Sequence, residues 1–173
     1  LILAGHGIHI AHAQEVFKTF VEKTGIPVGS TIHGLSAIPD DHPLMKGMLG
    51  MHGNLGPNML TNSCDVLIAV GMRFDDRVTG NLSKYAKQAK VIHIEIDPSE
   101  IDKNVKTTVA INADAKEALE ALTQLVDNKT YPEWYAQFDA FHQKEYEKVI
   151  ARDLDLSLEK GMTMGRVIKE ISK

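Results

Sequence analysis

The sequence predicts an α/β protein built on a parallel sheet of about six strands, with helices flanking the sheet. The apolar run Val66–Val70 is short, β-branched at both ends and closed by Gly71, as in a strand buried on both faces of a parallel sheet. Such runs alternate with helical periodicity through residue 126, which is typical of parallel strands joined by crossovers. The charged stretch Gly71–Gly80 follows the central strand, where open α/β sheets bind ligands. A solvated turn explains the same charges without a ligand.

Five strands are visible, and a sixth is either hidden in the irregular stretch 32–50 or missing. We expect a long loop with one helical turn in that stretch, which holds Pro39, Pro43 and several glycines, and a loop of such length is usually functional. The expected strands are residues 1–4, 26–29, 66–70, 91–97 and 107–111.

Helices are expected between these strands and after the last one. Gly25 is placed as a C-cap of the first helix, and Pro27 prevents its continuation. Asp114 followed by Glu117 resembles a capping box. The expected helices cover residues 13–24, 57–62, 82–89, 114–126, with an apolar face of Ala115, Ala118, Leu119, Leu122, Leu125 and Val126, and a longer helix after Pro132, with Trp134, Phe138, Phe141 and Val149 on one side.

We divide the chain into a main domain, residues 1–130, a helix and linker, 131–162, and the start of a further unit, 163–173. The chain begins inside an apolar run and ends inside a helical pattern, so we expect a piece cut from a longer polypeptide. The net charge of -4 and the absence of a basic stripe argue against nucleic acid. No apolar run approaches the ~20 residues that span a bilayer. Cys64 is the single cysteine, which excludes a disulfide framework and fits a reducing, intracellular setting.

The strand ends favour an extended anionic cofactor of the adenine type, although the dinucleotide fingerprint fails. Ile10 occupies the third glycine position after Gly5 and Gly7. Arg73 is suited to a pyrophosphate, and a carboxylate of the segment Glu95–Asp97 can accept ribose hydroxyls. Backbone amides near Gly5, Gly7, Gly50 and Gly53 are further candidates for the pyrophosphate.

The histidines predict no metal site. His6, His9 and His12 lie three residues apart, but no carboxylate or cysteine lies near them in sequence. His52 is either a hydrogen-bond donor to a ligand or an ordinary loop histidine. His33 and His93 carry no usable signal.

One stretch resembles a known signature closely. Gly71–Gly80 resembles the G-x-R-F-D-D-R-V-T-G motif of the acetohydroxyacid synthase (acetolactate synthase) catalytic subunit family, and Leu49–Gly53 resembles its L-G-M-H-G motif. The segments 24–28, 93–97 and 100–104 follow in matching order, and the resemblance is clearest from Leu1 to Val126. It implies the Rossmann-like, FAD-binding central domain of a thiamine-diphosphate enzyme, with a six-stranded parallel sheet.

The resemblance also implies a set of site residues. Asp76 and Arg77 match positions that line the substrate channel. The implied FAD contacts are Gly5, His6, Gly7, Thr31, Ile32, Leu49, Gly50, Met51, His52, Gly71, Met72, Arg73, Phe74, Asp75, Glu95, Ile96, Asp114 and Ala115. The sequence departs from the family at His6, which replaces a glycine, at Glu95, which replaces an aspartate, and in the segment 54–58.

The implied full enzyme joins pyruvate to pyruvate or 2-oxobutyrate in branched-chain amino acid biosynthesis. Thiamine diphosphate and Mg²⁺ bind in the family's other domains, so we expect no catalysis from this chain alone. The implied partners are its own N- and C-terminal domains, a second copy in a homodimer or tetramer, and a small regulatory subunit, in a bacterial cytoplasm. A related thiamine-diphosphate enzyme such as glyoxylate carboligase and a cofactor-free structural domain remain alternatives, and a sirtuin-type deacylase is disfavoured by the lack of cysteines for its zinc module.

Overall fold

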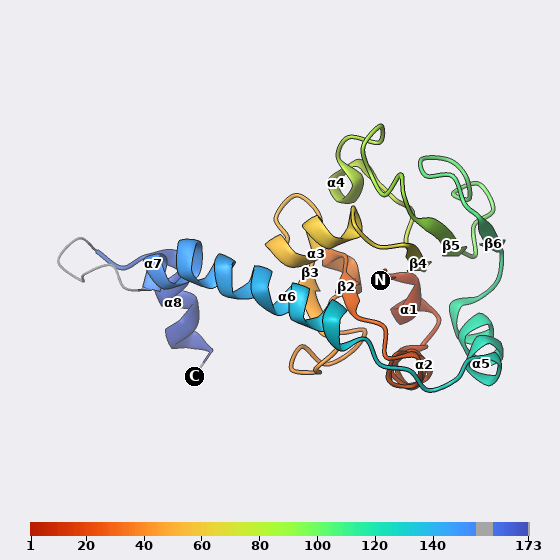
Figure 1. The fold of residues 1–173 in the computed structure, drawn as a ribbon, viewed down its shortest axis with the longest axis horizontal. Coiled ribbons are helices and arrows are strands. Elements are labelled where there is room, and N and C mark those ends of the chain that lie inside the picture. The colour runs from red at the N-terminus through yellow and green to blue at the C-terminus, as the bar shows by residue number, and fades with distance from the viewer. Residues whose placement is uncertain (155–160, 173) are drawn as a thin grey trace.

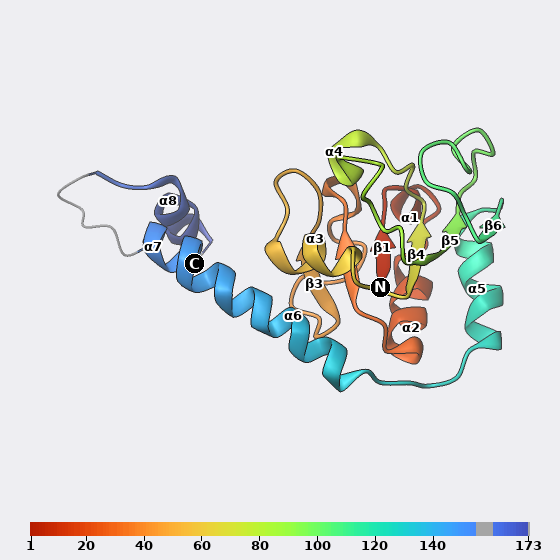
Figure 2. The same cartoon turned by 45° about the horizontal axis from the view of Figure 1, so that its top comes forward.

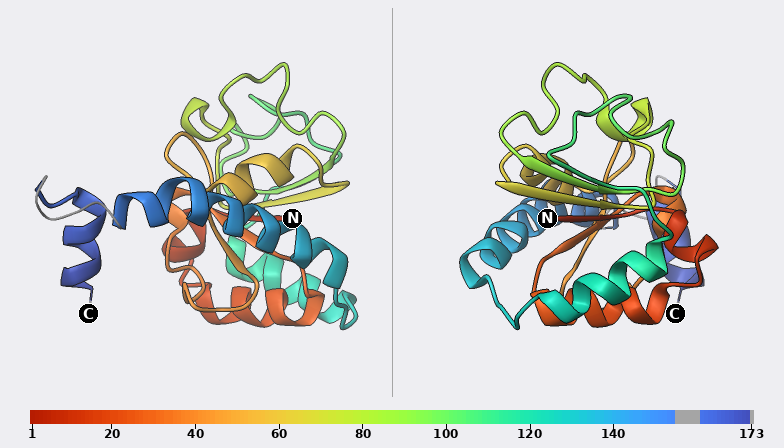
Figure 3. Two further views of the ribbon diagram at one scale, coloured as in Figure 1. Left: turned by 60° about the vertical axis from the view of Figure 1, so that its left-hand side comes forward. Right: turned by 90° about the vertical axis from the view of Figure 1, so that its right-hand side faces the viewer.

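The protein is a six-stranded parallel sheet covered by helices on both faces (Figures 1 and 3). The computed structural model describes residues 1–154 and 161–172. The strands are β1 Ile2–Ala4, β2 Val28–Ser30, β3 Met45–Met48, β4 Val66–Val70, β5 Lys90–Ile94 and β6 Val109–Ile111. Every neighbouring pair is parallel, in the order β3-β2-β1-β4-β5-β6. The predicted fold class is therefore confirmed.

The strands separate two apolar cores because successive side chains point to opposite faces. Ile2, Ile68 and Val70 pack on one face, with Phe17 of helix α2 and Leu119 of helix α5. Leu3, Leu67 and Ala69 pack on the other face, with Leu60 of α3 and Phe138 of α6. The helices are α1 Gly7–Ile10, α2 Gln14–Thr24, α3 Leu55–Thr61, α4 Asp76–Thr79, α5 Ala115–Leu125, α6 Pro132–Glu145, α7 Ala151–Leu154 and α8 Met164–Ile171, with a 3₁₀ turn η1 at Ile32–Gly34 and a π-helical turn η2 at Tyr146–Ile150.

Local signals placed several boundaries correctly. Gly25 ends α2 in the left-handed conformation, with φ +65°, and its amide donates to the Val21 carbonyl. Asp114 caps α5 through its carboxylate. The sixth strand is β3, inside the stretch 32–50, which also holds the turn η1. Sequence periodicity does not reveal β3 because this four-residue edge strand, paired only with β2, includes Lys46 and Gly47.

Three expected elements differ from the structure. Residues 82–89 form turns instead of a helix. Ala86 has a φ of +45°, which no right-handed helix contains, and the Ala86 amide donates to the side chain of Asn62. Strand β5 ends at Ile94, so residues 95–97 belong to the loop that follows it. Leu125 is 80% exposed and does not join the apolar face of α5.

The C-terminal helices leave the sheet as one rod, formed by α6, η2 and α7 over residues 132–154, with α8 at its far end (Figures 1 and 2). Phe138 is buried against the sheet domain, whereas Val149 is exposed beyond it. The expected helix and linker, residues 131–162, contain α6, η2 and α7, and residues 155–160 lie outside the described part of the chain. Thr163 caps α8, so a new helix begins where we expected a further unit; the domain boundaries stay a prediction.

Candidate functional site

The predicted cofactor residues all lie at the carboxyl edge of the sheet. Each strand end supplies one group, and the order of strands reverses between β1 and β4, the place where open α/β sheets bind ligands. The groups are Gly5–Gly7 after β1, Thr31–Ile32 after β2, Leu49–His52 after β3, Gly71–Asp75 after β4, Glu95–Ile96 after β5, and Asp114–Ala115 after β6.

Glycines allow the loops after β1 and β4 to touch where the strand order reverses. A Cβ atom on Gly5 would lie 2.2 Å from the Gly71 carbonyl oxygen, and one on Gly7 would lie 2.6 Å from the Gly71 Cα. The Gly7 amide donates to the Gly71 carbonyl at 2.9 Å. Contact between the loops after β1 and β4 thus requires these glycines, with or without a ligand.

The amides of four candidate glycines have acceptors within the protein. The Gly5 amide donates to the Val70 carbonyl and the Gly53 amide to the Gly50 carbonyl. The Gly50 amide donates to Asn58 Oδ1 at 2.8 Å, and Gly7 donates to Gly71 as described above. These four amides are therefore not free for a pyrophosphate, and the expectation that amides near these glycines bind one stays a prediction for their neighbours.

The loop after β4 alternates between the core and the solvent. Met72 and Phe74 are buried, whereas the side chain of Arg73 is 68% exposed. Phe74 has a φ of +51°, and its carbonyl accepts a hydrogen bond from the Asn104 side chain. His93 is fully buried, and its Nε2 donates to the Met72 carbonyl at 2.7 Å. Hydrogen bonds therefore fix the backbone on both sides of Arg73, while the Arg73 side chain is exposed to solvent.

Three predicted contact residues perform local structural tasks. Asp75 caps α4 by accepting from two amides, and its other oxygen lies 3.7 Å from Arg73 Nε. Asp114 caps α5 in the same way. The Thr31 hydroxyl accepts from the Gly34 amide and donates to the Ala4 carbonyl. Leu49 and Ala115 are buried, and Leu49 also lines a cavity described below.

The exposed apolar side chains at this edge come from three different strand ends. Ile32 is 64% exposed, Met51 59% and Ile96 64%. Glu95 is half-buried, and its Oε1 accepts from the amides of Ile96 and Asp97. The edge therefore offers apolar side chains, the Arg73 cation and the Glu95 carboxylate. This combination suits a large ligand in which an anionic group joins planar rings.

The predicted cofactor residue Met51 and the predicted channel residue Arg77 lie side by side. The Met51 amide donates to the Arg77 carbonyl at 2.8 Å, and the Arg77 guanidinium lies 3.6 Å from the Met51 sulfur. A cavity of about 370 Å³ lies beside them, lined by the loop after β3, by α3 and by residues 76–80, so Asp76 and Arg77 both line it. Met51, a predicted cofactor residue, and Arg77, a predicted channel residue, therefore line the same cavity.

The histidines near β1 hold neighbouring loops. His6 Nδ1 donates to the His33 carbonyl at 3.1 Å, and His9 Nε2 donates to the Leu35 carbonyl at 2.9 Å. His52 is exposed. Among residues 1–154 and 161–172, no group of histidine, cysteine, aspartate and glutamate side chains is arranged to hold a metal.

Several residues that fix the site carried no signal in the sequence. Asn58 bonds both the amide and the carbonyl of Gly50, and Asn104 Nδ2 donates to the Phe74 carbonyl. Asn112 Nδ2 donates to the carbonyls of both Glu95 and Ile96. His93 acts from within the sheet. The one clue to such residues in the sequence is a polar side chain inside or next to a buried strand, because buried polar groups need hydrogen-bond partners.

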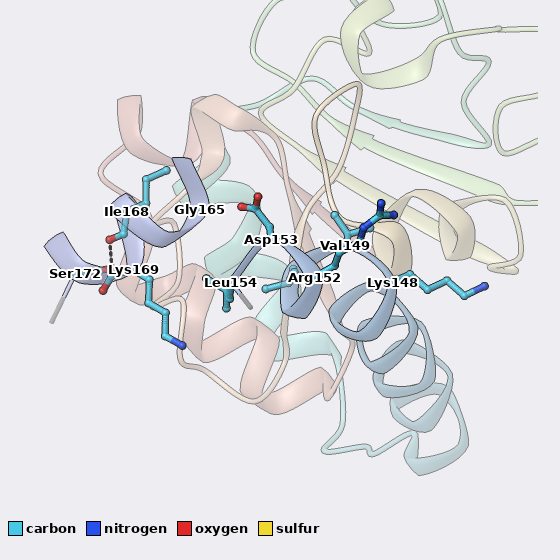
Figure 4. Close-up of a pocket in the computed structure, with 10 residues that line it drawn as sticks. Lys148, Val149, Arg152, Asp153, Leu154, Gly165, Ile168, Lys169 and Ser172 are labelled. Atoms are coloured by element: carbon cyan, nitrogen blue, oxygen red, sulfur yellow. Dashed lines mark hydrogen bonds between the residues drawn. The ribbon is translucent and has the colours of Figure 1, made fainter. Parts of the chain in front are cut away.

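A second cavity lies far from this edge. It encloses about 670 Å³ between the end of the rod and α8, with walls from residues that include Val149, Leu154 and Ile168 (Figure 4). No predicted site residue lines it. Within the described residues, no helix has the length and apolarity to cross a membrane.

Comparison with known proteins places this chain beside one family of enzymes. Residues 1–122 match the family described as thiamine pyrophosphate enzyme, central domain. The chain is 49% identical over 122 residues to the probable acetolactate synthase large subunit of Methanocaldococcus jannaschii, covering 70% of this chain and 21% of that protein. It is 46% identical over 135 residues to the acetolactate synthase large subunit of Lactococcus lactis, covering 78% and 24%. It is 40% identical over 147 residues to the acetolactate synthase isozyme 2 large subunit of Escherichia coli, covering 85% and 27%. The matched region is about a fifth to a quarter of each relative.

Proposed function

Because this chain belongs to the thiamine pyrophosphate enzyme family, as its central domain, we propose that it binds FAD at the carboxyl edge of its sheet within an acetolactate synthase large subunit. The relatives support the enzyme assignment, and their names say nothing of FAD. The observation that carries the cofactor proposal is the exposure of Ile32, Met51, Ile96 and the Arg73 side chain on loops that follow four different strands at the carboxyl edge of the sheet. Exposed apolar side chains on several loops at one edge of a sheet are typical of a ligand-binding surface.

The residues fit the chemical groups of a flavin dinucleotide. Arg73 would bind the pyrophosphate through its planar fork. Glu95 uses Oε1 for two backbone amides, which leaves Oε2 to accept from ribose hydroxyls. The apolar side chains would lie against the rings. Asp76 and Arg77 would face the substrate channel.

In the whole enzyme, thiamine diphosphate with Mg²⁺ would supply the decarboxylation of pyruvate and the joining of two 2-oxo acids. This chain would contribute binding and orientation, and we expect no turnover from it alone. Assembly with its own flanking domains, with a second copy and with a small regulatory subunit, and a location in the bacterial cytoplasm, stay predictions from the family resemblance.

A flavin titration of the chain tests the proposal, followed by flavin fluorescence and by the thermal unfolding midpoint. We expect quenching of the flavin and a raised midpoint. Arg73→Ala should weaken binding by about tenfold or more, since a hydrogen bond to a charged group contributes about 1.5–3 kcal/mol. Arg77→Ala keeps the backbone bond to Met51 and should spare binding. Equal losses for both variants would show that Arg73 has no special place at the site.

A cofactor-free structural domain is the second candidate. The close packing of Gly5 and Gly7 on Gly71, and the internal acceptors of four glycine amides, favour it, because they explain those residues without a ligand. No response to FAD at high micromolar concentrations would support this reading for the isolated chain.

A further inference from the structure

The loop of residues 49–53, called the Gly50 loop below, is held by one amide side chain at its turn. Gly50 has a φ of +102°. Its amide donates to Asn58 Oδ1 at 2.8 Å, and Asn58 Nδ2 donates to its carbonyl at 3.0 Å. A single side chain thus satisfies both polar groups of one residue, as a neighbouring strand would. The conformation of the loop therefore depends on helix α3, which carries Asn58.

A second asparagine anchors the loop where it returns to β3. The Met48 amide donates to Asn54 Oδ1 at 2.9 Å, and the Asn54 amide donates to the Met48 carbonyl at 2.7 Å. Gly47 makes room for this contact, because a Cβ atom there would lie 2.4 Å from Asn54 Oδ1. Asn54 is the N-cap residue of α3, yet its side chain makes no capping bond.

Glu145 caps α3 in its place, from the end of α6. The Leu55 amide donates to Glu145 Oε1 at 3.1 Å, and Asn54 Nδ2 donates to Glu145 Oε2 at 3.2 Å. The carboxylate binds a helix N-terminus, where a negative charge is favourable, and it also fixes the asparagine that holds Met48. One side chain of the rod is therefore bonded directly to Asn54 and Leu55, and through Asn54 it is linked to Met48.

The position of Glu145 on the rod gives this contact a further meaning. It is the last residue of α6, and the backbone changes to π-helical pairing at Tyr146. Such changes of helical pairing occur often at functional sites. Beyond this residue the rod extends away from the sheet domain (Figures 1 and 2), so a rotation of the rod displaces the carboxylate from α3.

We propose that Glu145 is a positioning residue, which couples the rod to the Gly50 loop at the ligand edge. Met51, in this loop, is one of the exposed apolar residues of the proposed flavin site. The effect on flavin rests on the proposed function, whereas the effect on the loop does not. The occupant of the edge would in turn bias the rod, because coupling between two sites is reciprocal.

Hydrogen exchange on the chain of residues 1–173 tests the coupling, with Glu145→Ala, Glu145→Gln and Asp139→Ala. Asp139 is a matched control, since this exposed acid of α6 pairs at 3.2 Å with Lys46 of β3, which lies outside the loop. In Glu145→Ala we expect the amides of Met48, Gly50 and Leu55 to exchange about ten times faster or more, while those of β1 and β4 keep their rates. Glu145→Gln should have a smaller effect, because glutamine keeps an acceptor for Leu55 but turns a donor toward Asn54.

Unchanged exchange at these amides in Glu145→Ala would overturn the proposal. An equal rise in Asp139→Ala would overturn it too, because the loss would then reflect the docking of α6 in general. If Glu145→Ala fails to fold, Glu145→Gln decides by the same readout. FAD affinity should fall in Glu145→Ala and stay unchanged in Asp139→Ala. If the unmodified chain fails to bind FAD but shows the exchange pattern, the proposed function fails and the coupling stands.

Discussion

Gly71 at the reversal point of the sheet is expected to be intolerant of a side chain. It has a φ of +59°, and a Cβ atom would lie 2.6 Å from the Gly7 Cα and 2.9 Å from the Gly7 nitrogen. Both partners are backbone, so neither can move aside by changing a rotamer. The left-handed conformation costs an alanine about 1–2 kcal/mol, and overpacking adds about 1–3 kcal/mol. Gly71→Ala should therefore lower the free energy of unfolding by about 2–5 kcal/mol.

Gly80→Ala separates the two contributions. Gly80 also has a positive φ, +56°, but no atom of the described chain lies within 4 Å of the position of its Cβ. Its ψ of −119° lies outside the left-handed helical region, so Gly80→Ala should carry a backbone cost of about 1–3 kcal/mol and no steric cost. Urea unfolding of both variants gives the difference, provided that the slope with denaturant is unchanged. A loss of only about 1–2 kcal/mol in Gly71→Ala, which is the backbone part alone, would refute the steric argument. Unchanged stability with lost FAD binding in Gly71→Ala would show that the glycine serves a ligand instead.

Three further substitutions test the packing and the charges around the edge. Tyr85→Phe should raise the free energy of unfolding by about 1 kcal/mol in chemical denaturation, because the buried hydroxyl has no hydrogen-bond partner among the described residues. Burial also raises the pKa of Tyr85 above its ordinary value of 10, so the unfolded phenol ionises first and stability should fall as the pH rises past about 10, a loss that the variant should lack. Asp102→Asn should make the free energy of unfolding fall less steeply as the pH is lowered. Hydrogen bonds from the amide and hydroxyl of Thr107 lower the pKa of Asp102 below 3.8. The stability that the ionised carboxylate contributes is therefore complete above that pH and is lost as the pH falls through the lowered value. Asp114→Ala should cost about 1 kcal/mol in urea unfolding by removing the cap of α5; a cost near zero would show that tertiary packing alone fixes this helix end.

Sequence reasoning found the elements that depend on close neighbours. The strand β4, the C-cap at Gly25 and the N-cap at Asp114 follow from residues a few positions apart. Strand β3 was missed because its pairing with β2, rather than an apolar pattern, makes it a strand. The helix expected at 82–89 was wrong because a long-range bond to Asn62 holds Ala86 in a turn.

The amino-acid sequence by itself determined the class of fold and the family, and it placed predicted site residues after the strands β1, β2, β4 and β6. Periodicity and signature motifs are properties of consecutive residues, and they survive without knowledge of the fold. The tertiary structure decided what the residues at those ends do. It turned Gly5, Gly7 and Gly71 into a backbone contact, and it joined Glu145 to Asn54 across 91 positions. Such contacts depend on the order of strands and on the path of α6, which no local pattern encodes.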